Sequence, residues 1–280
     1  MQRKILKQNM MEMTWCEIDE MAKKNAIVLL PIGVIEEHSR HLPLATDIYL
    51  AIAQAEDLAD EMKNCGCPCI IAPPFYWGMI SVVTKHFPGS FVSKEETVVA
   101  VLKDILESLE NAGFKRVISV NAHGDPAHRI AIVRAFREFN TEHELKARWL
   151  TFEDDMKYEG FNGTEEYILP VPPYPFEKMI QCTRELRDEF DVHAGAFETA
   201  FMRDIFPEMV NMDIAKKLMP TMMNGEGKKK WNSDIVENKN IIPDGHAGDP
   251  AFSQYIKTDM KSANIEIAHG IIKFYEEKEA

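Results

Sequence analysis

The amino-acid sequence predicts an α/β fold of three layers, with a mostly parallel central sheet flanked by helices. One observation is a short, almost continuous apolar run, AIVLLPIGV at 26–34, which is typical of a strand covered on both faces. A second is that similar runs alternate along the chain with amphipathic stretches, and a third is that the 280 residues contain no low-complexity linker. This alternation favours a parallel sheet with helices on both faces, in a single domain over residues 1–280.

The other elements follow in chain order, each as a short apolar strand or as a helical stripe with apolar spacings of three and four. They are a helix from Ile48 to Met62, a strand at 68–74, a helix from Val98 to Leu109, a strand at 116–120, a helix at 127–139 and a strand at 146–152. The next stretch is polar, aromatic and proline-rich, which predicts a long loop or lid over about 153–180. Two further helices are expected, from His193 to Ile205 and from Asp259 to Glu277.

The composition argues against several classes of partner. Acidic residues outnumber basic ones by 45 to 32, the formal net charge is -13, and there is no basic cluster, so nucleic acid is not expected as a partner. No segment approaches the roughly 20 apolar residues of a membrane-spanning helix. The N-terminal stretch lacks the apolar core of a signal peptide, which favours a cytoplasmic location.

Five cysteines, an odd number, favour reduced thiols over a disulfide framework. Three of them, Cys65, Cys67 and Cys69, occur at every second residue, unlike the CxxC turn that binds zinc. The favoured interpretation is a set of small apolar residues leading into a buried strand, and a structural metal is the less favoured alternative.

Titratable side chains gather where two of the predicted strands end. In GVIEEHSRHLPLATD, Glu36, His38 and Asp47 follow the first strand, and NAHGD places His123 and Asp125 after the third. Ligand sites of parallel sheets lie at the carboxyl ends of the strands. Nitrogen and carboxylate ligands together suit zinc, manganese or iron(II), and five of them suffice for two cations that share a carboxylate.

Each of these residues also has an ordinary structural explanation when it is considered alone. Asp47 could cap the helix that follows it, and Glu36 could be solvated. The metal interpretation is favoured because both strand ends supply a histidine and a carboxylate two residues apart.

The same motifs resemble those of the creatininase (creatinine amidohydrolase) family. LLPIGVIEEHSRHLPLATD is similar to P-x-G-S-x-E-Q-H-G-P-H-L-P-L-x-T-D, VNAHGD to N-G-H-G-G-N or N-G-H-x-E, and KHFPGSF to H-x-x-F-P-G-T. HAGAFETAFM resembles H-A-G-x-x-E-T, and GHAGDP resembles the late G-x-x-G-D-P. The matches occur in family order from about Trp15 to Pro250, so the resemblance covers most of the chain.

By position, the resemblance implies two divalent metal ions, zinc, manganese or iron. It implies that Glu36 and His123 hold one metal, that His38 and Asp125 hold the other, and that Asp47 bridges them. Asp125 stands where some members carry glutamate and others glycine.

The resemblance also implies that His193 shuttles a proton near the reacting carbonyl and that Glu198 supports the site. On one helix these residues would lie about 140° apart, so they share a site only if the helix begins between them. His86 of the KHFPGSF loop is a candidate for substrate binding. Arg40, which with Ser39 replaces the usual Gly-Pro, could bind an anionic or hydroxyl-rich substrate or could pair with the acidic surface.

The implied activity is a metal-dependent hydrolase, in which a metal-bridging hydroxide attacks a carbonyl of a small cyclic polar substrate and opens a cyclic amide or a related C–N bond. Creatinine itself is not favoured, because only Trp149 stands in the region where creatininase carries the tryptophans that stack its substrate. One alternative is a C–C bond hydrolase that opens a cyclic diketone of inositol catabolism, of the 3-dehydro-scyllo-inosose type. Another is a non-catalytic metal-binding module. The family also suggests a homo-oligomer, often a hexamer.

Overall fold

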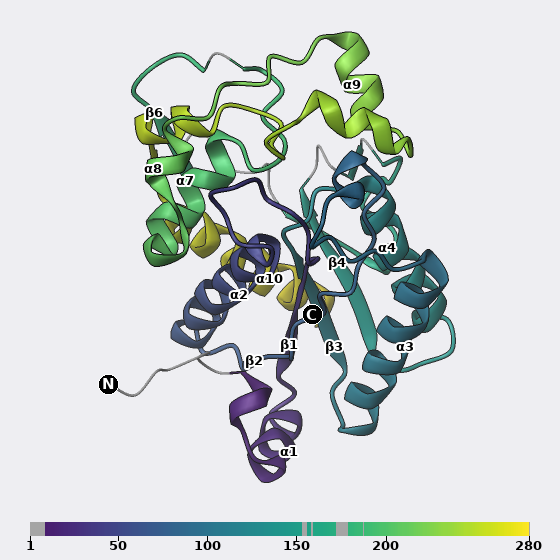
Figure 1. Ribbon diagram of the computed structural model, residues 1–280. Helices are drawn as coiled ribbons and strands as arrows, with labels where there is room; N and C mark the ends of the chain where they lie inside the picture. Colours follow the sequence, from purple (N-terminus) through teal and green to yellow (C-terminus); the bar gives the residue numbers. More distant parts are fainter. Residues whose placement is uncertain (1–8, 153–155, 158, 172–178, 187, 280) are drawn as a thin grey trace.

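Five parallel strands in the order β2-β1-β3-β4-β5 form the central sheet (Figure 1). The computed structural model describes residues 9–152, 156–157, 159–171, 179–186 and 188–279. The strands are β1 (Ile27–Ile32), β2 (Cys69–Ile71), β3 (Arg116–Asn121), β4 (Lys146–Phe152) and β5 (Ile168–Val171). The predicted α/β class is confirmed, because helices cover both faces of this sheet.

Two pairs of helices form the outer layers. One face of the sheet packs on α3 (Glu95–Asn111) and α4 (Pro126–Asn140), and the other packs on α2 (Thr46–Asn64) and α10 (Met260–Glu279). Alternate residues of β1 divide between two cores. Val28, Leu30 and Ile32 join the α3/α4 side, and Ile27 and Leu29 join the α2/α10 side. The run of 26–34 is therefore continuously apolar because both faces of the strand are buried.

The N-terminal helix α1 (Trp15–Lys23) precedes β1 and begins with a capping box between Thr14 and Glu17. Just before it, Asn9 forms a parallel bridge with Ile71 of β2, and its side-chain amide reaches the Ala72 carbonyl at 3.5 Å. The segment at Asn9 thus lies along the outer edge of β2.

The elements between β5 and α10 gather above the carboxyl ends of the strands (Figure 1). They are β6 (Ile180–Cys182), α7 (Ala196–Ile205), α8 (Met212–Ala215), α9 (Gly225–Trp231) and β7 (Ile256–Thr258), with β6 and β7 paired antiparallel. Short 3₁₀ helices lie at Met10–Glu12, Val83–His86, Pro207–Met209, Val236–Ile241 and Pro250–Tyr255. This end of the sheet is where the sequence predicts ligand binding.

The prediction of a loop over 153–180 is wrong for Ile168–Val171, because these residues form strand β5 beside β4. The sequence does not indicate this strand because it contains Pro170, and proline is uncommon within strands. A proline is tolerated here because β5 is the outer strand of the described sheet, where a missing N–H removes no bond to a further strand. Residues 153–155, 158 and 172–178 of the predicted lid lie outside the described residues. Within the described chain, no helix combines the length and the apolar character that crossing a membrane requires.

Candidate metal centre

The loop between β1 and α2 carries Glu36 and His38 into the interior. The Glu36 N–H donates to the Leu44 carbonyl at 3.0 Å, which closes the loop. Ser39 adopts a φ of +61°, in the left-handed region. Two contacts hold it there: its N–H donates to Glu37 Oε2 at 3.0 Å, and its hydroxyl donates to the Asp244 carbonyl at 2.7 Å. The family pattern usually has glycine at this position, which agrees with the backbone conformation.

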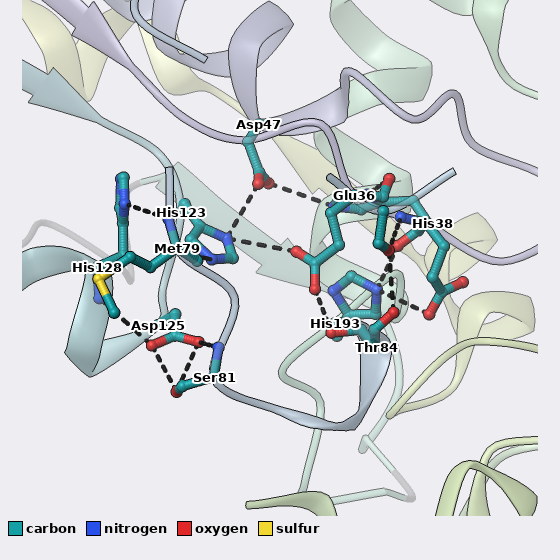
Figure 2. Close-up of polar contacts among 12 residues, drawn as sticks. Glu36, His38, Asp47, Met79, Ser81, Thr84, His123, Asp125, His128 and His193 are labelled. Atoms are coloured by element: carbon teal, nitrogen blue, oxygen red, sulfur yellow. Dashed lines mark hydrogen bonds and ion pairs between the residues drawn. The ribbon is translucent and has the colours of Figure 1, made fainter. Parts of the chain in front are cut away.

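Asp47 lies in the first turn of α2, but it does not cap the helix. The helix starts at Thr46, and the N-cap residue is Ala45. The Asp47 carboxylate instead lies between two histidines, with Oδ1 3.3 Å from His38 Nε2 and Oδ2 3.0 Å from His123 Nδ1 (Figure 2). The N-terminal end of α2 favours this negative charge.

Both histidines are oriented by backbone carbonyls. Nδ1 of His38 lies 3.0 Å from the Glu36 carbonyl, and Nε2 of His123 lies 3.2 Å from the Met79 carbonyl. A ring nitrogen that faces a carbonyl must donate a proton, so these contacts fix the orientation of each ring and turn its other nitrogen toward Asp47, where a cation could replace the proton that this nitrogen carries in the metal-free protein. This is the arrangement of metal-ligating histidines, whose second nitrogen is held by an outer acceptor.

Two groups of three side chains share Asp47. One group is Glu36, Asp47 and His123, and the other is His38, Asp47 and Glu198; within each group the ligand atoms lie within 4.8 Å of one another. Glu36 Oε2 is 3.4 Å from His123 Nδ1, and Glu198 Oε2 is 3.8 Å from His38 Nε2. The Glu36 Oε1 atom accepts a short hydrogen bond from the Thr84 hydroxyl, so Oε2 is the atom turned toward His123.

The electrostatics of the metal-free cluster are dominated by its burial and by its paired charges. Burial disfavours the imidazolium form, but the Asp47 charge outweighs it and raises the pKa of His38 to about 10 and that of His123 to about 9. Burial raises the pKa of Glu36. For Asp47 the two histidines outweigh burial and lower the pKa. The cluster thus holds protons at neutral pH in places that cations can take.

The start of α7 brings His193 and Glu198 to the same site. The helix begins at Ala196, between the two residues, as a shared site requires. Nε2 of His193 lies 2.7 Å from the Glu37 carbonyl, and its ring centroid lies 4.4 Å from that of His38. Glu198 Oε2 accepts the Ala194 N–H at 2.6 Å. Burial lowers the pKa of His193, but the Glu36 charge and the contact with Glu37 outweigh it, so the net shift is upward.

Asp125 belongs to neither of these two groups, although it lines the cavity beside them. Its carboxylate accepts hydrogen bonds from the Ser81 hydroxyl at 2.8 Å and from the Ala127 N–H at 2.8 Å, and so it caps α4 (Figure 2). The structure places Glu198, and not Asp125, beside His38. Aspartate is one methylene shorter than the glutamate of some family members, and at an N-cap position its oxygens bind the free N–H groups of the helix.

Arg40 and His86, the two predicted substrate-binding residues, contact acidic side chains outside the cluster. Arg40 has a side chain that is 70% exposed and pairs with Asp244 at 3.2 Å, which agrees with the alternative of an arginine on the acidic surface. His86 Nε2 lies 3.4 Å from Asp234 Oδ1. Neither Arg40 nor His86 is among the described residues that line the cavities at the cluster.

Two adjoining cavities open at the cluster. One, of about 520 Å³, is lined in part by Glu36, Asp47, His193, Phe190 and Trp231, and the other, of about 540 Å³, is lined in part by Trp149, Phe152 and Phe201. Both cavities are in the size range of small-molecule sites.

The residues common to both cavities are His123, Gly124, Arg129 and Glu198. Sequence reasoning missed Arg129, which lies in the first turns of α4 and forms an ion pair with Glu159 at 2.6 Å. Its position four residues after Asp125 was a usable signal, because that spacing returns a helical residue to the face of the N-cap.

Known proteins resemble this chain over most of its length. It is 24% identical over 212 residues to the creatinine amidohydrolase of Pseudomonas putida. This alignment covers 72% of this chain and 73% of that enzyme. It is also 22% identical over 245 residues to the 3-dehydro-scyllo-inosose hydrolase of Thermotoga maritima. That alignment covers 84% of this chain and 62% of that enzyme.

Solved structures share the fold. A structure described as "Creatininase Mn" has a TM-score of 0.68 at 19% identity and covers 97% of this chain and 98% of that one. A mutant creatininase of "Zn-Zn type" also has a TM-score of 0.68 at 19% identity, with coverage of 96% and 97%. The family model described as creatininase, creatinine amidohydrolase, matches residues 11–258. Because this match spans most of the sequence and includes the buried histidines and carboxylates described above, the chain belongs to the creatininase family.

Proposed function

We propose that this creatininase-family hydrolase would hold two divalent cations, with Asp47 as a ligand of each. The observation that carries the proposal is that each Asp47 oxygen faces a different histidine, at 3.3 Å and 3.0 Å. Glu36 and His123 would complete one site, and His38 and Glu198 the other. Asp125, which caps α4, is not part of this ligand set.

The chemistry of the donor atoms fits such cations. Glu36 Oε2, His38 Nε2 and Asp47 Oδ2 are buried and make no well-formed hydrogen bond among the described atoms, so that only the ion-pair contacts within the cluster reach them. Buried polar atoms without partners are costly, and a cation would satisfy all three. The mixture of imidazole and carboxylate favours zinc, manganese or iron(II) over calcium. Two such cations, when bound, activate a water molecule and polarise a carbonyl oxygen.

The protein's own groups provide the remaining functions. His193 lines the cavity of about 520 Å³ and has a raised pKa, so it is placed to hold a proton for the leaving atom. The Glu37 carbonyl fixes the orientation of its ring at 2.7 Å. His193 would therefore act on the substrate, whereas His38 and His123 would hold the cations.

The cavities favour a small, planar and oxygen-bearing substrate. Among the described residues that line them, Arg129 is the only one with a permanent positive charge. Its guanidinium group already pairs with Glu159 and would face the oxygen atoms of a substrate from that ion pair, while Trp231 and Phe190 offer aromatic surface. We propose hydrolysis of the C–N bond of a cyclic amide other than creatinine. Opening of a cyclic diketone by C–C hydrolysis is the second candidate, because Arg129 equally suits keto and hydroxyl oxygens.

Metal analysis and turnover of the same samples test this proposal. The protein purified without added metal or chelator should contain about two equivalents of zinc, manganese or iron per chain, as expected for a two-metal site. Asp47→Asn, which keeps the shape of the side chain, should lose both metal and activity. His193→Gln should keep its metal and slow turnover by roughly 10²- to 10⁴-fold.

The substrate panel should set cyclic amides against cyclic diketones, and the class that is turned over identifies the bond. Full metal occupancy without turnover of either class would favour the non-catalytic module. Loss of metal in His193→Gln would contradict the separation of its role from that of the ligands.

A further inference from the structure

We propose a second metal site, outside the buried cluster, at the seam between α2 and α10. Its ligands would be Glu61, Cys65 and His269, which together suit a zinc-like cation. Their ligand atoms lie within 4.8 Å of one another. His269 Nε2 is 2.9 Å from Glu61 Oε1, and Cys65 Sγ is 3.6 Å from the same oxygen.

Rigid elements bring these three residues together. Glu61 is in the last turn of α2, and Cys65 is its C-cap residue, so a spacing of four places them on one face. His269 comes from α10, more than 200 positions later in the chain. Sites on packed helices hold ligand geometry better than sites on loops.

The register between the two helices is fixed next to the proposed site. Asn264 of α10 lies between two residues of α2: its amide donates to Asp57 Oδ2 at 2.9 Å, and its oxygen accepts from Gln54 Nε2 at 3.3 Å. The second carboxylate oxygen of Glu61 accepts from Asn64 Nδ2 at 3.3 Å, which orients the carboxylate. The triad is therefore a consequence of helix packing.

The donor set indicates which cation the site would take. A thiolate, an imidazole and a carboxylate suit zinc, and water would supply the fourth position of a tetrahedron. Calcium and magnesium, which prefer oxygen alone, would be disfavoured. Cys65 is exposed and the side chain of His269 is 55% exposed, so the cation would enter directly from solvent. Because it links α10 to α2, it would stabilise the fold and would take no part in the reaction.

Sulfur makes this site spectroscopically separate from the buried cluster, whose grouped ligands are nitrogen and oxygen. The holoenzyme, with its catalytic site loaded with zinc, should be titrated with cobalt(II). We expect a near-ultraviolet sulfur-to-cobalt charge-transfer band that saturates at about one equivalent per chain, as expected for a single site with a thiolate ligand. The result does not depend on activity, so its failure is distinguishable from failure of the proposed function.

Variants assign the ligands. Cys65→Ser should abolish the band, and His269→Asn should weaken cobalt binding at least about tenfold, the smallest loss that changes around a metal site typically cause. Cys16→Ser and Cys182→Ser, at two other exposed cysteines, should leave the band unchanged. His143→Asn, at a histidine that pairs with Glu110, should also have no effect.

Zinc should also raise the thermal unfolding midpoint of the wild-type holoenzyme but not that of Cys65→Ser. The proposal would be overturned by the absence of the band in the wild type. It would also be overturned by persistence of the band in Cys65→Ser, which would assign the sulfur to another cysteine, or by an unchanged cobalt affinity in His269→Asn.

Discussion

Glu198 and Asp125 are carboxylates with different partners, and these partners predict different effects of substitution. Glu198 Oε2 lies 3.8 Å from His38 Nε2, whereas the Asp125 oxygens bind Ser81 and the first turn of α4. Glu198→Gln should therefore remove one of the two metal equivalents. Asp125→Ala should retain both and lower the free energy of unfolding by about 1–2 kcal/mol, the usual cost of a lost N-cap.

Metal analysis and urea denaturation of both variants give the comparison. A loss of metal in Asp125→Ala together with full occupancy in Glu198→Gln would restore the ligand set implied by the sequence motif.

At the scale of elements, α7 depends on a cap that comes from outside the helix. Its N-cap residue is Gly195, and Asp191 supplies the acceptor: its carboxylate receives the N–H groups of Ala196 at 2.7 Å and Phe197 at 3.2 Å. Because this turn carries Glu198, Asp191→Ala should weaken metal binding as well as lower the free energy of unfolding by about 1–2 kcal/mol.

Thr14→Ala is a matched control for the cap of α7, because Thr14 caps α1 through its capping box. It should cost a similar free energy of unfolding, measured by urea denaturation, and leave the metal affinity unchanged. Equal metal affinity in Asp191→Ala and Thr14→Ala would show that the start of α7 does not control the site.

At the scale of the whole molecule, stability should depend on pH in a way that bound metal suppresses. In the metal-free protein the pKa values of His38 and His123 are raised to about 10 and about 9. A raised histidine pKa stabilises the fold fully below the unfolded value of about 6.5, and the contribution is lost as pH rises through the folded values. The lowered pKa of Asp47 acts in the opposite sense, and its contribution is lost on acidification.

Chelator-treated protein should therefore lose stability between about pH 6.5 and 10, while metal-loaded protein should not, because cations replace the protons. Thermal unfolding midpoints across this range provide the measurement, and metal binding at pH 7 should release protons. Parallel midpoint curves for the two forms would contradict this account.

Features that depend on a local pattern of apolar residues could be predicted from the sequence. Features that depend on where an element lies in the sheet, or on which group a side chain faces, could not. The continuous apolar run of β1 and the stripe of α2 follow from burial, so both could be predicted. Strand β5 could not, because Pro170 is compatible with a strand only at an edge.

The site shows the same division. The presence of Glu36, His38, Asp47 and His123 in the segments that follow β1 and β3 was visible in the sequence, and the structure brings these residues together. Residue type does not reveal whether a carboxylate faces a cation or a helix N-terminus, so the cap that Asp125 forms on α4 could not be distinguished from a metal ligand in the sequence. Contacts between residues distant in the chain, such as Arg129 with Glu159 and Glu61 with His269, require the tertiary structure.

The two borders of the central sheet have a consequence for assembly. At β5, Pro170 lacks the N–H group with which an added strand would pair, and at β2 the bridge from Asn9 already occupies part of the border. An exposed edge strand can pair with the edge strand of another chain, which leads to aggregation. Pro170 at β5 and the Asn9 bridge at β2 both oppose such pairing. Copies of the chain that associate should therefore meet through helices and loops, so that each subunit keeps a sheet of its own.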